Sequence, residues 1–234
     1  MCAFITLPAV MQSIWKFRCT LVMLLLSFGP GAWGQQSASA LSADQALSRL
    51  LAGNARFVAH KEQHPDQFLT RRRELISGQH PFAVILGCSD SRVPPELLFD
   101  EGFGDLFVIR VAGNIVDDAI LGSVEYAVEH LGTKLIVVLG HEKCGAVSAA
   151  VASENASGHL SALVSAIRPA VLSTASSPGD RIHNCVVENV RRVARQIRES
   201  EPVLKEATQR GGVKVIAADY ELDTGQVRLL DSRP

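Results

Sequence analysis

The chain has 234 residues, of which 47% are hydrophobic and 20% charged, a composition typical of one globular domain with a short extension. Its formal net charge is -1. The chain therefore lacks the overall basic character by which nucleic acids and anionic lipids are bound. We expect a small neutral or anionic substrate and no nucleic acid partner.

The N-terminal residues have the features of a signal peptide. Lys16 and Arg18 precede an apolar run at residues 21–28, a Gly-Pro pair ends the run, and no acidic residue occurs before Gln35. This order is typical of export. Because a membrane-spanning helix needs about 20 apolar residues, we expect no stable membrane anchor. Cleavage near Gly34 would release a periplasmic or secreted mature chain.

Three segments follow from this interpretation: a signal peptide at 1–34, a flexible lead at 35–41 and a catalytic domain at 42–234. Either Met1 or Met11 can be the true start, since Met11 gives a more ordinary short basic lead. The mature chain keeps only three cysteines, Cys88, Cys144 and Cys185. Exported domains that rely on disulfides carry an even and denser set, so this number favours a metal or reactive-thiol role.

Apolar spacing predicts a helical arm followed by an α/β domain. Helical periodicity covers residues 41–61, with Ser42 as a plausible cap, and a second helix is expected at 66–76. After Pro81 the pattern changes to short apolar runs, typical of parallel strands buried on both faces. The predicted fold is a mostly parallel four-stranded sheet with an antiparallel fifth edge strand, flanked by helices. The strands are expected at 82–87, 106–110, 135–140, 213–218 and 227–230, and a further helix at 186–199.

Two cysteine motifs follow predicted strands. Cys88 comes directly after the first strand, and His141 and Cys144 come after the third, three residues apart at the start of a helix. In open α/β sheets, ligands bind beyond the carboxyl ends of the strands. If these strands are neighbours, two thiolates and one imidazole converge. A catalytic zinc ion takes three such ligands and keeps one position open for water. The pattern therefore predicts a zinc centre.

Two charged residues stand next to the predicted centre. Asp90 and Arg92 are close enough for a bidentate pair. One interpretation is a purely structural ion pair that shapes the loop. The other, which we favour, is that Asp90 accepts a hydrogen bond from zinc-bound water or hydroxide and orients it toward substrate. Zinc would lower the pKa of its water, and because two thiolates cancel the dication's charge, activity should rise toward alkaline pH.

At these residues the sequence resembles the β-carbonic anhydrases. The family's paired signature is C-x-D-x-R, here at residues 88–92, followed by H-x-x-C, here at residues 141–144. The resemblance covers about residues 42–231 and implies reversible hydration of carbon dioxide to bicarbonate and a proton, one Zn2+ per subunit, and a homodimer or homotetramer with active sites near the interface. Further matching stretches are 110–114, 122–127, 188–190 and 220–225.

Less specific roles also follow from the resemblance. Gln79 would hydrogen-bond the substrate oxygen, although a solvated turn residue is an equal alternative, and the backbone N–H of Gly145 would support bicarbonate. Asp90 would become a fourth zinc ligand in a closed, inactive state. Ile85 stands where bicarbonate-responsive members carry Trp, which argues against that effector site. Residues 113–114 would shape the pocket wall through an unusual turn.

Three other functions are compatible with parts of the pattern. A related zinc site could hydrolyse carbon disulfide or carbonyl sulfide. A cysteine phosphatase is disfavoured because Cys88 and Arg92 are too close in sequence for the usual phosphate loop. A non-catalytic zinc protein would have no need of Asp90 and Arg92. Cys185 lies apart from both motifs and is expected to be a buried inert thiol.

Overall fold

A five-stranded sheet runs through the part of the chain that the computed structural model describes, residues 41–153 and 156–230. The strand order is β2-β1-β3-β4-β5. Neighbouring strands are parallel except for β4 and β5, which pair antiparallel. The predicted fold class is therefore confirmed. The strands are β1 (Ala83–Gly87), β2 (Leu106–Arg110), β3 (Leu135–His141), β4 (Lys214–Tyr220) and β5 (Val227–Leu229).

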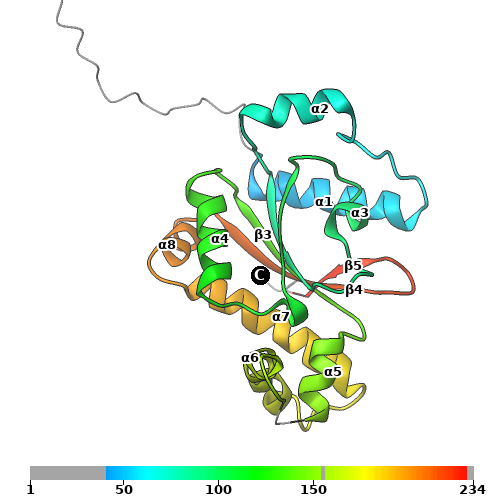
Figure 1. Cartoon of the computed structure of the whole chain (residues 1–234), viewed down its shortest axis with the longest axis vertical. Helices are drawn as coiled ribbons and strands as arrows, with labels where there is room; N and C mark the ends of the chain where they lie inside the picture. The colour runs from blue at the N-terminus through cyan, green and yellow to red at the C-terminus, as the bar shows by residue number, and fades with distance from the viewer. Residues whose placement is uncertain (1–40, 154–155, 231–234) are drawn as a thin grey trace, which may run out of the picture. The chain divides into compact units, whose positions relative to one another are not determined.

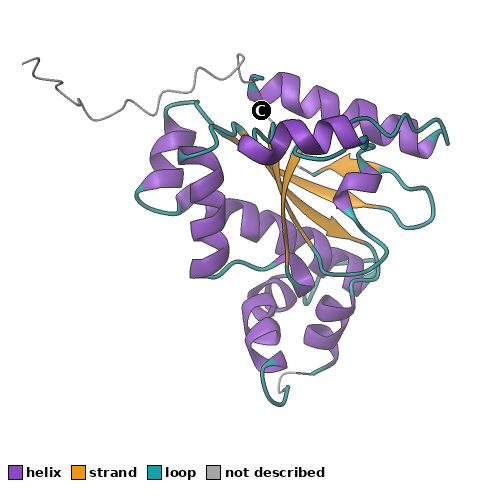
Figure 2. Cartoon of the chain, turned by 45° about the horizontal axis from the view of Figure 1, so that its top comes forward, coloured by secondary structure: helices purple, strands orange, loops and turns teal. Residues whose placement is uncertain are grey.

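The helices lie on both sides of this sheet (Figures 1 and 2). Every residue of β1 and β3 is buried, which explains why these strands are apolar without alternation. The α-helices are α1 (Ala43–Val58), α2 (Leu69–Glu74), α3 (Pro95–Leu98), α4 (Asp118–Glu129), α5 (Gly145–Ala152), α6 (Leu160–Ser173), α7 (Arg181–Glu199) and α8 (Val203–Gln209), and the 3-10 turns are η1 (Leu75–Ser77) and η2 (Ala112–Asn114).

The predicted helical boundaries need three corrections. The first helix ends at Val58, earlier than expected. The second helix begins at Leu69, later than expected, and its last turn is the 3-10 helix η1. The third, α7, begins five residues earlier than predicted, because the Asp180 carboxylate accepts a hydrogen bond from the backbone N–H of His183 and caps the helix there. The predicted signal peptide at 1–34 and the lead as far as residue 40 lie outside the described residues.

The helical arm α1 is fixed to the domain by charge pairs. Ser42 caps α1 as predicted, in a reciprocal capping box. Arg49 binds both carboxylate oxygens of Glu101, and Arg56 binds the Asp100 carboxylate. Both acids are almost completely buried. Because a buried carboxylate is costly without a partner, these pairs hold the arm in one position.

One glycine allows α1 to approach the loop after α3. A Cβ atom on Gly53 would lie 1.8 Å from the carbonyl oxygen of Phe99, so only glycine fits at this helical position. The neighbouring Asn54 is buried and bonds three backbone groups: the oxygens of Leu98 and Gly225 and the N–H of Val227. These contacts connect the arm to the turn before β5.

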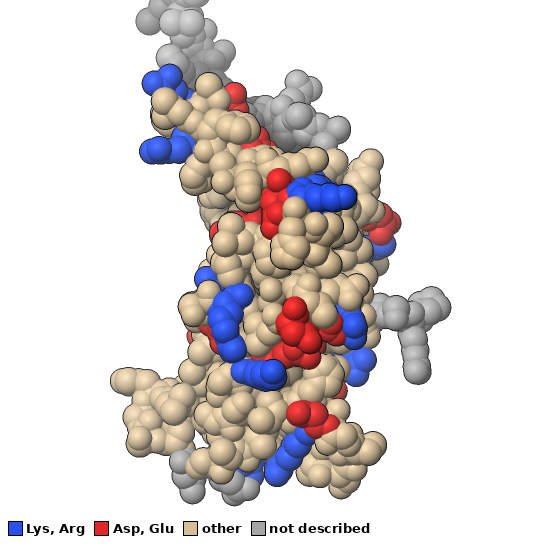
Figure 3. All heavy atoms as spheres, turned by 90° about the vertical axis from the view of Figure 1, so that its right-hand side faces the viewer, with Lys and Arg blue, Asp and Glu red and all other residues tan. Residues whose placement is uncertain are grey.

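The surface carries both signs of charge. On the face shown in Figure 3, Lys and Arg side chains are interspersed with Asp and Glu rather than gathered by sign.

Within the described ranges, the structure contains no helix whose length and apolarity would allow it to cross a bilayer.

Candidate metal centre

The three predicted ligands meet at one edge of the sheet. Cys88 follows β1, His141 is the last residue of β3, and Cys144 is the N-cap of α5. Because β1 and β3 are parallel neighbours, their carboxyl ends reach the same edge. The ligand atoms all lie within 4.8 Å of one another, and all three residues are buried. The two Sγ atoms are 3.9 Å apart.

The predicted local structure of His141 was wrong. His141 ends strand β3, where it is in register with Tyr220, rather than starting a helix with Cys144. The direction of the chain changes at Lys143, which has a left-handed backbone (φ 51). A tight turn, and not helical spacing, therefore brings the imidazole and the thiol to one point.

The imidazole of His141 is prepared to donate to a metal. Its Nδ1 lies 2.8 Å from the carbonyl oxygen of Glu142, so Nδ1–H donates this bond and Nε2 carries the free lone pair. Nε2 is buried and has no hydrogen-bond partner among the described residues. A buried acceptor that faces two thiols fits a zinc ion bound by Cys2His, with a fourth position left open.

The two thiols lie 3.9 Å apart and influence each other's pKa. The hydrogen bond with Cys144 lowers the pKa of Cys88, although burial opposes the shift. The backbone N–H of Gly113 also donates to the Cys88 sulfur, at 3.3 Å. The same hydrogen bond raises the pKa of Cys144, and burial adds to this, while N–H groups in the first turn of α5 oppose it. Cys88 therefore ionises first.

Asp90 and Arg92 form the bidentate pair that their spacing predicts. The guanidinium donates to both carboxylate oxygens, at 2.9 Å and 2.7 Å. These bonds hold the pKa of Asp90 well below its usual range. Oδ2 of Asp90 lies 3.9 Å from Nε2 of His141. The carboxylate is therefore beside the ligand group and bound to Arg92.

Arg110, the last residue of β2, stabilises the loop that carries these residues. Its guanidinium donates to the carbonyl oxygen of Cys88 at 2.9 Å and to that of Asp90. Sequence reasoning included Arg110 only as part of a matching stretch. The position of Arg110 at the end of a predicted strand was the feature that could have indicated a role near the site. Only the strand order β2-β1, however, shows that it reaches the Cys88 loop.

The turn at Gly113 is unusual, as expected. Gly113 has a left-handed backbone (φ 73), and a Cβ there would lie 2.7 Å from Ile167 Cδ1. Asn114 also has a positive φ. On α7, the buried Asn189 donates to the Gly113 carbonyl oxygen at 2.9 Å. Sequence reasoning did not identify this contact, because it joins segments far apart in the chain.

The two residues expected to contact substrate lie in different places. Gly145 is the exposed first residue of α5, directly after Cys144. Gln79 is exposed and precedes the amino end of β1, whereas Cys88 follows its carboxyl end. Five residues of strand separate these ends by about 16 Å. Within one chain, Gln79 therefore does not reach the three ligands.

A buried carboxylate on β4 was not anticipated from the sequence. Asp219 is in register with Gly140, and its Oδ1 has no hydrogen-bond partner among the described residues. Its Oδ2 lies 3.9 Å from Nδ1 of His183. Burial raises the pKa of Asp219 from 3.8 to about 6.

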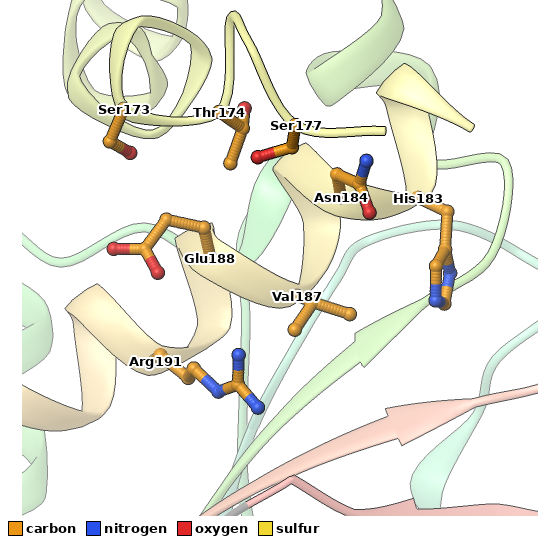
Figure 4. A pocket seen from close by; sticks show the side chains of 8 residues that line it. All are labelled: Ser173, Thr174, Ser177, His183, Asn184, Val187, Glu188 and Arg191. Carbon is orange, nitrogen blue, oxygen red and sulfur yellow. The ribbon is translucent and has the colours of Figure 1, made fainter. Parts of the chain in front are cut away.

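A hollow of about 400 Å³ lies between the end of α6 and the first half of α7 (Figure 4). Its charged groups already have partners: Glu188 pairs with Arg195, and Arg191 donates to the Leu230 carbonyl oxygen. Nearby, Cys185 is fully buried with its sulfur 2.9 Å from the Thr174 hydroxyl, which confirms the expected buried thiol.

The fold and the donor set define an α/β protein with a Cys2His metal-binding centre, and comparison with known proteins specifies its family. A family model described as carbonic anhydrase matches residues 83–227. Carbonic anhydrase 2 of Mycobacterium tuberculosis is 40% identical over 190 residues, which cover 80% of this chain and 92% of that protein. The chain belongs to the β-carbonic anhydrase family, so its enzyme class is carbonic anhydrase, a lyase.

Solved structures agree with this assignment. A tetrameric β-carbonic anhydrase from Sordaria macrospora superimposes with a TM-score of 0.65 at 27% identity, covering 79% of this chain and 96% of that one. The Coccomyxa β-carbonic anhydrase in complex with acetazolamide gives a TM-score of 0.64 at 29% identity, covering 79% and 86%. The family implies reversible hydration of carbon dioxide, typically with zinc, and the Cys-His-Cys group fits a zinc site.

Proposed function

We propose that the chain hydrates carbon dioxide at one zinc ion per subunit held by Cys88, His141 and Cys144. The observation that carries this proposal is the buried Nε2 of His141, which has no partner among the described residues. An unpaired buried acceptor is costly, and zinc bound also by the two nearby thiolates would satisfy it. The same three atoms leave a fourth position for a small reactant.

A zinc ion held by Cys88, His141 and Cys144 would act as a Lewis acid that lowers the pKa of a water molecule and so would supply a nucleophile near neutral pH. The Asp90 carboxylate accepts a hydrogen bond from the attacking water and directs its lone pair at the carbon of carbon dioxide. Arg92 keeps Asp90 ionised and holds its orientation. The backbone N–H of Gly145, at the start of α5, supports the bicarbonate product.

Asp90 is also the candidate for a closed state. We assign it the role of fourth ligand at low pH. Its Oδ2 is bound by Arg92 and is also the oxygen closest to His141 Nε2, at 3.9 Å. A change of the Asp90 rotamer away from Arg92 would bring this oxygen into the centre, with no movement of the strands.

The metal and the reaction are tested together by three proteins. Wild type and Cys185→Ser are expected to bind one zinc ion per chain and to hydrate carbon dioxide, because Cys185 lies in the core apart from the centre. Cys88→Ser is expected to lose most of its zinc and its activity. Zinc binding by wild type without hydration between pH 7 and about 9 would contradict the proposed reaction. Hydrolysis of carbon disulfide in its place would assign a different substrate.

We further propose a homodimer or homotetramer in which Gln79 serves the site of a neighbouring subunit. Gln79 is too far from Cys88 in its own chain, and the segment of α2 and η1 that precedes it exposes apolar side chains, with Phe68 60% and Ile76 83% accessible. Strand β2 also forms an edge of the sheet. Mixing Gln79→Ala and Cys88→Ser chains tests this: each variant is expected to be weakly active alone, and mixed oligomers must regain activity at sites with both residues intact.

We also propose export of the chain with removal of residues 1–34 and a periplasmic or secreted location. The order of charge, apolar run and small residues supports this. N-terminal sequencing of the protein from culture fractions tests it. A mature chain that begins near Gln35 is expected, and an intact N-terminus on the cytoplasmic protein would contradict it.

A further inference from the structure

Two hydrogen bonds connect helix α7 to the sulfur of Cys88 through a single glycine. Asn189 Nδ2 donates to the Gly113 carbonyl oxygen at 2.9 Å, and the Gly113 N–H donates to Cys88 Sγ at 3.3 Å. All three residues are buried, Asn189 being only 2% exposed. Both contacts therefore lie in a region of low dielectric, where a hydrogen bond has a large electrostatic effect.

Gly113 alone cannot fix the direction of its own N–H. Glycine adopts a wide range of φ and ψ, and here it holds the left-handed conformation φ 73, ψ 15. The side chains around it exclude a Cβ, since Ile167 Cδ1 would be 2.7 Å and Ala146 Cβ 3.2 Å away. Packing thus requires glycine. The peptide that follows Gly113 is held at both of its polar groups: its carbonyl oxygen accepts from Asn189 Nδ2, and its N–H, that of Asn114, donates to the Val111 carbonyl oxygen at 2.9 Å.

We propose that Asn189 is a positioning residue of the metal centre: it holds the carbonyl of the Gly113–Asn114 peptide and so restricts the backbone of Gly113, whose N–H, in the preceding peptide, donates to the Cys88 thiolate. This inference rests on the proposed zinc ligation by Cys88. An N–H···S bond withdraws charge from the thiolate and sets its orientation, and such outer-shell contacts change metal affinity by about 10- to 100-fold. Asn189 acts through Gly113 and touches neither ligand nor substrate.

The test uses purified full chains with Asn189→Ala and Asn189→Ser. The serine variant serves if the alanine variant does not fold, because serine keeps a small polar side chain at this position. The matched control is Val193→Ala, a buried position one turn further along the same helix that loses packing but no side-chain hydrogen bond. Two readouts are followed: the rate of zinc transfer to a chromogenic chelator, and the near-ultraviolet sulfur-to-metal charge-transfer band of the cobalt-substituted protein.

We expect both Asn189 variants to release zinc at least about tenfold faster than wild type and to show a shifted charge-transfer band, because the Cys88 sulfur gains charge. Val193→Ala is expected to unfold more easily while its band and zinc release stay as in wild type. A folded Asn189 variant with an unchanged band and unchanged zinc release would overturn the inference. Absence of any sulfur-to-cobalt band in wild type would instead contradict the proposed ligands.

Discussion

Oδ2 of Asp90 lies 3.9 Å from Nε2 of His141, beyond hydrogen-bonding distance, and the two atoms face the same small volume. Arg92 binds this oxygen. Asp90 could therefore become a metal ligand, as proposed for the closed state, only by giving up its bidentate pair with Arg92. If the proposed closed state forms, the strength of the Asp90–Arg92 pair would set how much of it is populated.

Replacing Asp90 by asparagine should separate catalysis from metal binding. The Asp90→Asn variant keeps the size of the side chain but loses the charge that Arg92 binds and one of the two acceptor oxygens, which weakens the proposed acceptor for the attacking water. We expect kcat to fall by about 100-fold, within the range for loss of a positioned acid or base, while the zinc content stays at one per chain. Asp118→Asn, an exposed position in the first turn of α4, is the control. Loss of zinc from the Asp90 variant would show that Asp90 is needed as a ligand.

The buried carboxylate of Asp219 should make stability depend on pH. Its pKa rises from 3.8 to about 6 on folding, so the folded chain binds the proton more tightly than the unfolded one. The stabilisation is complete below about pH 4 and is lost as pH rises through 6. At 1.36 kcal/mol per pH unit, the loss amounts to about 3 kcal/mol.

Asp219→Asn should remove this dependence. Urea unfolding is expected to show the variant up to about 3 kcal/mol more stable than wild type at pH 7.5, with the difference shrinking toward pH 4. His183 faces Asp219 at 3.9 Å and is kept unchanged. A difference that is constant from pH 4 to 7.5 would show that Asp219 does not titrate in this window.

Two glycines inside helices should respond in opposite directions to the same substitution. Gly53→Ala places a Cβ 1.8 Å from the Phe99 carbonyl oxygen, which forces α1 away from the domain and should cost at least about 2 kcal/mol. Gly122→Ala in α4 meets nothing within 4 Å and should stabilise by up to about 1 kcal/mol. Denaturant unfolding measures both. A destabilised Gly122 variant would show that another subunit covers this position.

The ion pair between Arg49 and Glu101 should matter far more than an exposed pair. Arg49→Met leaves Glu101, which is 1% exposed, without its main partner and should cost about 3 kcal/mol at pH 7.5. Arg210→Met, which breaks an exposed pair with Glu206, should change the free energy of unfolding by less than about 1 kcal/mol. Equal effects of the two substitutions would mean that Glu101 is solvated or paired differently in solution.

The fold and the ligand set could be predicted from the sequence because both are encoded locally. Apolar runs located the ends of all five strands to within two residues, the largest difference being at the end of β4, and the position of Cys88 and His141 at strand ends was enough to bring them together. No range was predicted for α6, which contains Pro169 in its interior. The start of α7 was placed five residues too late, although its cap, Asp180, is a local signal that the sequence offers.

The residues that were missed act across the fold. Arg110 reaches the Cys88 loop only because β2 lies next to β1, and Asn189 reaches Gly113 only because α7 packs near η2. Asp219 looked like an ordinary polar residue at the end of a strand. Its burial and high pKa come from α7, which covers this part of the sheet. Contacts of this kind depend on the order of strands and the packing of helices, and a single sequence does not reveal either.

The division of the ligands between the β1 loop and the end of β3 has a consequence for biogenesis. Neither segment alone offers three donors, so an unfolded chain cannot hold the ion as the native state does. The proposed zinc ion would therefore be acquired only after the central strands assemble, and once bound it would oppose their separation. A chain that crosses a membrane unfolded would consequently take its metal from the compartment in which it folds.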